Sequence, residues 1–340
     1  MTRGPVGGAP GLLAGRRPPE VVVVGSASRD LVADDRRGWR LGGGVSYAAL
    51  ASARLGVRTA AVIGLDPQAR DAHELELLTR AGVALLRVPL AHGPVFRNVE
   101  ANGRRRQDCL DPGSPLAPVA LPPGWADAAA WILAPVAAEL PDAWLEVIGV
   151  DAFMALGWQG LLRTLRAGGS VTRRRPQSGR LVARANLVAL SQRDLVPGTR
   201  PGDLAPFLKP GAWLVVTAGA GGGVYGRATA GGLGAMGRYP AFAVAGEVDA
   251  TGAGDTFLAA LVASLVHSAG PSTRSGGAGG GAGDGAGDPW RVPDVAFAAA
   301  VASFTVEGPG LAAVPNLAAV RRRLAGAPGQ SFAEPPSSST

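Results

Sequence analysis

The residues best suited to chemistry lie at 248–265, VDATGAGDTFLAALVASL, where a glycine-rich turn runs into apolar residues at helical spacing. This pattern predicts a helix beginning near residue 252. The first N–H groups of a helix lack partners and its dipole is positive there, so the turn favours an anion. Asp255 then has two interpretations. It caps the helix, or it takes a proton from a substrate hydroxyl while the N–H groups of Gly252, Ala253 and Gly254 hold the charge of a transferring phosphoryl group.

Residues 249–257, DATGAGDTF, resemble the C-terminal signature DTxGAGDxF of the PfkB/ribokinase family of carbohydrate kinases, which act on sugars, nucleosides and inositols. Ala250 replaces the usual threonine. The resemblance implies that Asp255 is the general base, that the 252–254 turn is the anion hole, and that the cofactors are ATP and Mg²⁺. It also implies a monovalent cation such as K⁺ near Asp249 and Thr251 in the members that need one.

The residues implied to bind substrate lie near the start of the chain. LGGGVSYAAL, residues 41–50, is a second glycine turn opening a helix, and it is similar to the family's GGxxxNxAxxxAxLG with Tyr47 in place of asparagine. The resemblance assigns Gly42, Gly43, Tyr47 and Asp30 to substrate binding, and the tyrosine points to a polyol other than ribose. From the residues alone, the glycines equally fit tight helix–sheet packing and Asp30 fits a turn.

Two polar residues follow later strands. GWQGLLR, residues 157–163, resembles the family's D-x-Q-G-x-L-R with Gly157 in place of the acid, so Gln159 either contacts substrate or simply ends a strand. SQRD, residues 191–194, stands where the family has N-x-x-E. There the resemblance gives Asp194 a role in holding magnesium and phosphate through water.

The glycine run at 218–223 has two matches. Gly221, Gly223 and Gly226 satisfy GxGxxG, but no helix is predicted after them, which disfavours a dinucleotide site. Residues 217–222 fit T-x-G-x-x-G, which resembles the family's nucleotide-binding turn between two strands. This second match assigns Thr217, Gly219 and Gly222 to the cofactor ATP.

Composition excludes several classes of protein. Lys209 is the only lysine and lies in a turn, which excludes P-loop NTPases and protein kinases. One cysteine and three scattered histidines give no zinc site. The net charge of +7 comes with short basic runs that lack aromatic neighbours, so nucleic acid is not an expected partner. No run of about 18 apolar residues predicts a membrane span, and no signal peptide is recognised, so a cytoplasmic location is expected.

The organisation predicted for the chain is one α/β domain at 19–325 between disordered segments at 1–18 and 326–340. The resemblance implies a ribokinase-like fold, with a central, mostly parallel sheet flanked by helices and a small β-hairpin lid. Alternation around Asn102-Gly103 predicts that hairpin, with the lid at about 85–110. The resemblance implies that the lid closes over the substrate and forms a homodimer interface. From the residues alone, the segment also fits an ordinary edge hairpin. Residues 270–288 read as a flexible Gly-rich insertion.

These patterns predict an ATP-dependent kinase that phosphorylates a hydroxyl of a small polyol: a sugar, an inositol or a nucleoside. The alternative is a sensor of the same fold that binds a polyol or nucleotide without turnover. The departures at Tyr47, Gly157, Ser191 and Asp194 favour the sensor, whereas the retained Asp255 in an intact GAGD favours the kinase.

Overall fold

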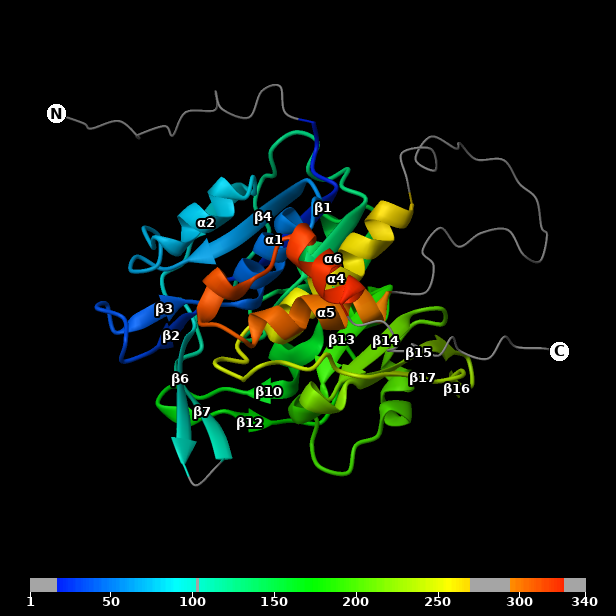
Figure 1. Cartoon of the computed structure of the whole chain (residues 1–340). Coiled ribbons are helices and arrows are strands. Elements are labelled where there is room, and N and C mark those ends of the chain that lie inside the picture. Colours follow the sequence, from blue (N-terminus) through cyan, green and yellow to red (C-terminus); the bar gives the residue numbers. More distant parts are fainter. Residues whose placement is uncertain (1–16, 102–103, 270–293, 327–340) are drawn as a thin grey trace.

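The computed structural model describes residues 17–101, 104–269 and 294–326. The predicted Asn102-Gly103 turn, the Gly-rich insertion and most of the two predicted disordered ends lie outside these ranges. The described residues form a ten-stranded main sheet, a five-stranded sheet and a two-stranded hairpin (Figure 1). Within those ranges, no helix has the length and apolar character needed to cross a bilayer.

Parallel strands form the centre of the main sheet, in the order β5-β4-β1-β8-β9-β13-β14. Their sequences are nearly continuous apolar runs because both faces of the sheet are covered. Short apolar runs in the sequence predict strands at 21–24, 59–63, 131–133, 187–190 and 213–217, and each of these segments forms a strand of this sheet. The bounds are β1 (Val21–Ser26), β4 (Thr59–Leu65), β5 (Ala84–Pro89), β8 (Ala130–Leu133), β9 (Phe153–Gly157), β13 (Leu187–Ser191) and β14 (Trp213–Thr217).

The strand order reverses beside β1. The chain moves outward from β1 through β4 to β5, and then returns to β8 on the other side of β1. The loops at the carboxyl ends of β1 and β8 therefore diverge, and such a point is where open α/β sheets bind ligands. The topology places the candidate site at this edge of the sheet.

The two faces of the main sheet are covered differently. Val21 and Val23 of β1 pack in the core beneath the long helices, whereas Val22 and Val24 pack in a second core on the opposite face. The helical face carries α1 (Gly44–Arg54), α2 (Glu74–Arg80), α4 (Ala253–Ser268), α5 (Val295–Thr305) and α6 (Leu317–Ala325). The opposite face is covered by the short α3 (Arg180–Arg184) and by 3-10 turns such as Asp142–Glu146 and Pro201–Phe207.

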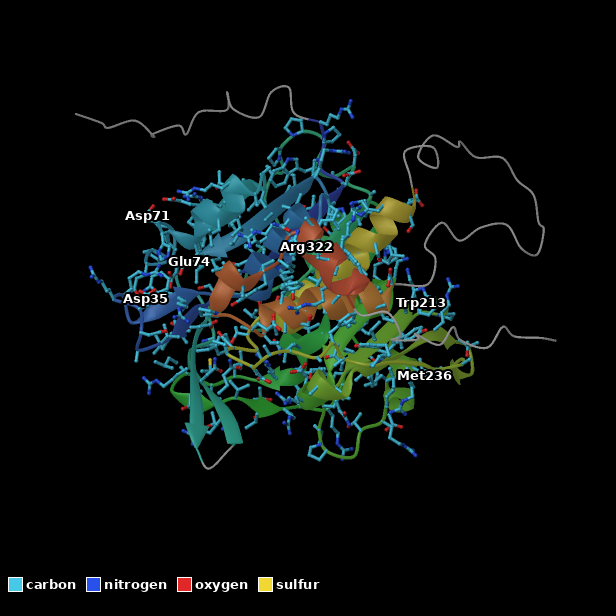
Figure 2. All side chains as sticks on the ribbon, in the orientation of Figure 1. Asp35, Asp71, Glu74, Trp213, Met236 and Arg322 are labelled. Atoms are coloured by element: carbon cyan, nitrogen blue, oxygen red, sulfur yellow. The ribbon has the colours of Figure 1, made fainter. Side chains whose placement is uncertain are left out.

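An antiparallel extension completes the main sheet beyond β14. It consists of β15 (Gly223–Thr229), β16 (Gly232–Leu233) and β17 (Gly237–Tyr239). Figure 2 places Trp213 and Met236 at this end of the molecule and Asp35, Asp71 and Glu74 at the other. The turn at 218–222 thus joins two antiparallel strands, as the second match to the glycine run predicts.

The five-stranded sheet, here called the lid sheet, is larger than the predicted hairpin. Its order is β11-β7-β6-β2-β3, and the predicted hairpin is confirmed as β6 paired with β7. Residues 85–89, included in the expected lid, belong instead to β5 of the main sheet, which pairs with β4. A homodimer through the lid sheet stays a prediction. The bounds are β2 (Arg29–Leu31), β3 (Trp39–Leu41), β6 (Val95–Ala101), β7 (Arg104–Asp111) and β11 (Gly169–Ser170); the separate hairpin is β10 (Arg163–Thr164) with β12 (Thr172–Arg173).

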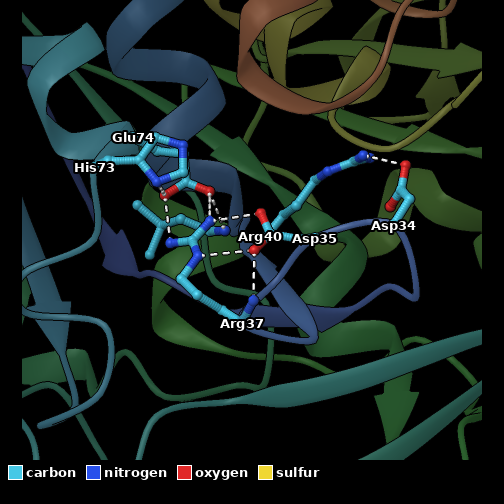
Figure 3. A network of polar contacts seen from close by, with 7 residues as sticks. Asp34, Asp35, Arg37, Arg40, His73 and Glu74 are labelled. Atoms are coloured by element: carbon cyan, nitrogen blue, oxygen red, sulfur yellow. Dashed lines mark hydrogen bonds and ion pairs between the residues drawn. The ribbon is translucent and has the colours of Figure 1, made fainter.

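A charged cluster anchors the β2–β3 part of the lid sheet to helix α2. Arg37 donates to both oxygens of the buried Glu74 carboxylate, at 2.6 and 2.9 Å, and also to Asp35 (Figure 3). The Leu41 N–H donates to Glu74 as well, at 3.1 Å, and the Arg37 guanidinium lies 4.3 Å from the centre of the Trp39 ring. Burial is the largest single influence on the Glu74 carboxyl and raises its pKa, but the hydrogen bonds from Arg37 and from backbone N–H groups together outweigh it, so the pKa lies below its usual value.

Replacing Arg37 by methionine is expected to lower the free energy of unfolding by about 2–3 kcal/mol at pH 7, because Glu74 would remain buried without its main partner. A carboxyl with a lowered folded-state pKa stabilises the fold above its unfolded pKa and loses that effect as the pH falls through the folded value. The deficit of Arg37→Met should therefore shrink in acid. Urea unfolding at pH 7 and pH 3.5 measures it, with exposed Arg70→Met as the control; an equal deficit at both pH values contradicts this account.

Candidate active site

The glycine turn at the start of α4 is built around a tyrosine from α1. Gly252 has a φ of +78°, in the left-handed region, and a methyl group added to it would lie 2.2–2.3 Å from ring atoms of Tyr47. Only glycine therefore fits both this backbone and this contact. The Asp249 carboxylate accepts the Thr251 N–H at 2.9 Å, which closes the turn on its N-terminal side. The turn expected from the sequence thus depends on a partner 205 residues away in the chain.

Asp255 lies in the first turn of α4, facing the N-terminus of α1. A methyl group on Gly44, the first residue of α1, would lie 2.6 Å from an Asp255 carboxylate oxygen. The residue keeps some exposed surface, yet burial of its carboxyl raises the pKa to about 7. The charges of Asp194 and Asp30 raise it too, while Arg163 lowers it. A carboxylate with a pKa near neutrality can exchange a proton at physiological pH, as a general base does.

The substrate-binding residues expected after β1 meet in one place. Asp30 accepts the Ser28 hydroxyl at 2.9 Å, and a methyl group on Gly42 would lie 2.1 Å from the other Asp30 oxygen. Gly43 has a φ of +89°, and a side chain there would meet the Ser26 carbonyl at 2.5 Å. The glycines therefore serve tight packing, as their residue types alone allowed, and this packing also holds the Asp30 carboxylate at the start of α1.

Tyr47 connects the two glycine turns. It is only 2% exposed. Its pKa is well above the usual value, first because it is buried and then because Asp30, Asp249 and Asp255 surround it with negative charge. Three aspartates from two segments are thus brought together around one phenol, which stays protonated and able to donate a hydrogen bond.

A second polar cluster surrounds Asp194, whose charge also acts on the Asp255 carboxyl. The Asp194 carboxylate, 7% exposed, accepts the Ser191 N–H at 2.9 Å and the Gln159 amide at 3.2 Å, and one of its oxygens lies 3.7 Å from an Arg163 nitrogen. Gln159 and Asp194, expected at the site from separate segments, are therefore in contact. Arg163 was not among the expected residues. Its signal was its place at the end of the GWQGLLR segment, directly after the residues that were singled out.

The turn expected to bind a nucleotide lies one strand away from Asp194. Thr217 ends β14 and pairs in register with Ser191 at the end of β13, so the turn and Asp194 share one edge of the sheet. Gly222 packs directly against the Tyr239 carbonyl, where a side chain would meet the oxygen at 2.0 Å. Across the turn, an Arg193 nitrogen lies 3.9 Å from the position of a methyl group on Gly219. An anion at this edge would meet arginine side chains.

The described residues offer few direct metal ligands. Across 17–101, 104–269 and 294–326, no group of three or more histidine, cysteine or acidic side chains is arranged to hold a metal ion. Both Asp194 oxygens already contact protein donors. Mg²⁺ usually keeps several waters and binds through one or two carboxylates together with a ligand's phosphates, so Asp194 would contact such an ion through water.

Comparison with solved structures identifies the fold. A pyrophosphate-dependent kinase in the ribokinase family, complexed with a pyrophosphate analog and myo-inositol, matches with a TM-score of 0.62 and 19% identity over 88% of this chain and 99% of its own. The ribokinase of Thermotoga maritima matches with 0.59 and 16% over 90% and 99%, and the nucleoside kinase of Methanocaldococcus jannaschii with 0.61 and 15% over 92% and 100%. No protein-family model and no curated protein sequence matches the chain. The chain has the ribokinase-like α/β fold, with its separate lid sheet.

Proposed function

We propose that the protein is a kinase that transfers a phosphoryl group to a hydroxyl of a small polyol: a sugar, an inositol or a nucleoside. The observation that carries this proposal is the position of Asp255. Its partly buried carboxyl has a pKa of about 7 and lies in a glycine turn at a helix start, facing a second glycine turn that holds Asp30. The ribokinase-like fold supports the same activity, since its solved members include sugar, nucleoside and inositol-binding kinases.

In the proposed reaction, Asp255 takes the proton of the acceptor hydroxyl. The hydroxyl oxygen bonds to the terminal phosphorus of the donor, and the bridging P–O bond of the donor breaks. Asp30, Gly42, Gly43, Tyr47 and Gln159 would orient the acceptor. The helix start would stabilise the equatorial oxygens of the transferring group. Ala253 N–H already donates to the Ala250 carbonyl at 3.3 Å, so the N–H groups of Gly252 and Gly254 are the stronger candidates for this role.

The proposed donor is ATP, held at Thr217, Gly219 and Gly222, with Mg²⁺ neutralising its phosphates and K⁺ near Asp249 and Thr251. Asp194 then acts by holding Gln159 and Arg163 in place. Pyrophosphate is the competing donor. Similar folds include ribokinase complexed with ribose and ATP as well as the pyrophosphate-dependent kinase, and Arg193 beside the turn suits either anion.

The direct test is product formation with each donor. The protein is incubated with Mg²⁺, ATP or pyrophosphate, and in turn ribose, fructose, adenosine, cytidine and myo-inositol, in K⁺ and in Na⁺, and phosphomonoesters are detected by ³¹P NMR. We expect one acceptor class to be phosphorylated from one donor. If no acceptor is phosphorylated from either donor while a polyol raises the melting temperature, the protein is a sensor of the same fold and the kinase proposal fails.

A further inference from the structure

Arg163 lies where the lid sheet, the Asp194 cluster and Asp255 come together. One guanidinium nitrogen donates to the Gln107 side chain on lid strand β7 at 3.2 Å, and the other lies 3.7 Å from Asp194. Gln107 in turn donates to Asn98 on β6 at 3.1 Å. A continuous polar chain therefore runs from both strands of the lid hairpin to the edge of the main sheet.

The surroundings of Arg163 fix its guanidinium in a definite orientation. Its side chain is 15% exposed and Asp194 is 7% exposed, so this contact is largely shielded from solvent. The arginine also opens β10, whose pairing with β12 holds its backbone. Among the described residues, the charges that act on the Asp255 carboxyl are those of Arg163, Asp194 and Asp30, and Arg163 is the cation of this set. Asp249 and Arg40 act on the neighbouring Tyr47.

We propose that Arg163 is a positioning residue that couples the lid to the catalytic carboxylate: it holds lid strand β7 and Asp194 together beside Asp255 through the two arms of one guanidinium. This inference rests on the proposed kinase function. A planar guanidinium can make both contacts at once, and a lysine ammonium on its flexible stem cannot hold them in the same geometry.

The coupling has a direct consequence for the base. With lid strand β7 in place, Gln107 holds the Arg163 guanidinium near Asp255. The positive charge lowers the pKa of Asp255 and so counteracts the effect of burial, which raises it. Displacement of β7 would remove the Gln107 contact, so the guanidinium would lose the hydrogen bond that ties it to the lid while its contact with Asp194 remained. The base is therefore most readily ionised when the lid hairpin is seated over the acceptor, where proton removal is useful and water is excluded.

The test compares four variants of the full chain. Arg163→Met removes the charge. Arg163→Lys keeps the charge but loses the planar guanidinium that contacts Gln107 and Asp194 at once, and Gln107→Met removes the lid contact alone. Arg166→Met is the matched control, because it removes an exposed arginine three residues away. The readouts are the pH dependence of kcat/KM and the titration of Asp255 followed by carboxyl ¹³C NMR, with its signal assigned by its absence in Asp255→Asn.

We expect Arg163→Met to lower kcat/KM at pH 7 by about 10²-fold. The acidic limb of its kcat/KM–pH profile and the midpoint of the Asp255 titration should both move upward by about one pH unit. Arg163→Lys should restore most of the titration but little of kcat/KM. Gln107→Met should move both readouts in the same direction by less, and Arg166→Met should move neither. Equal acidic limbs and titrations in Arg163→Met and wild type overturn the proposal. The NMR titration needs no turnover, so it decides the role of Arg163 even if the kinase assay shows no product.

Discussion

Asp255→Asn is expected to lose on the order of 10²- to 10⁴-fold in kcat/KM for the acceptor, because the amide keeps the shape of the side chain and cannot accept the hydroxyl proton. The wild-type profile supplies the sign of the pH effect. Asp255 acts as a base only when ionised, so with a pKa of about 7 the wild-type kcat/KM should fall about tenfold per unit below pH 7. The measurement is kcat/KM from pH 5.5 to 8.5 for both proteins. The variant's residual rate should be flat through the region where the wild-type rate falls.

Stability gives the control for this variant. A carboxyl whose folded-state pKa is raised destabilises the fold once the pH exceeds its unfolded pKa, because ionisation is easier in the unfolded chain. Asp255→Asn removes that cost, so its melting temperature at pH 8 should equal or exceed that of the wild type. A large loss of activity together with a lower melting temperature at pH 8 would point to a structural role, such as the helix cap that the sequence also allowed.

The second large effect is expected at Gly252. In Gly252→Ala, the added methyl group would lie 2.2–2.3 Å from the Tyr47 ring and the residue would have to adopt a φ of +78°. The clash with Tyr47 and the unfavourable φ can be relieved only if the start of α4 moves, and this movement shifts Asp255 and the N–H groups of the turn. We expect a loss of about 3 kcal/mol in the free energy of unfolding and at least 10²-fold in kcat/KM. Urea unfolding and steady-state kinetics measure the two losses.

A neighbouring glycine provides the matched comparison. A methyl group on Gly254, two residues further along, would meet nothing within 4 Å, and the φ of this residue does not lie in the left-handed region. Gly254→Ala should therefore keep the free energy of unfolding within about 0.5 kcal/mol of wild type or raise it. A second comparison is Gly252→Ala in a Tyr47→Ala background, where the clash is removed and the unfavourable φ remains. If Gly252→Ala costs as much there as in the wild type, Tyr47 is not what restricts the turn.

Local sequence patterns predicted the helices, strands and turns that depend on residues close to one another in the chain. The buried strand Trp213–Thr217 has the predicted limits because its apolar run ends at a glycine turn. The run of small residues at 293–307 predicts a helix that ends at a Gly-Pro-Gly segment, and α5 at Val295–Thr305 lies within that range. The glycine turn before α4 and the pairing of β6 with β7 were also readable, since each depends on residues near one another in the chain.

The parts that escaped prediction depend on contacts between distant segments. β2 joins the lid by pairing with β6, about 65 residues later, and nothing in the short sequence RDL announces this. The substrate contact predicted for Tyr47 from its motif position stays a prediction, whereas its packing against Gly252 could not be predicted because it requires α1 and α4 to be docked. Arg163 gains its importance only when β7, β10 and Asp194 are assembled. In each case the missing information is tertiary.

The unequal covering of the main sheet makes its two faces optically distinct. Trp125, Trp131, Trp144 and Trp158 all belong to the core on the face covered by 3-10 turns, and three of these indoles are almost completely shielded from water. The long helices α1, α4 and α5 pack on the opposite face. Among the described indoles, these four outnumber Trp39 and Trp213 of the helical-face core, so indole emission is weighted toward one layer and the ellipticity at 222 nm toward the other. When the protein is heated, coincident curves from the two signals mean that the layers melt as one cooperative unit, whereas separated curves reveal which layer loosens first.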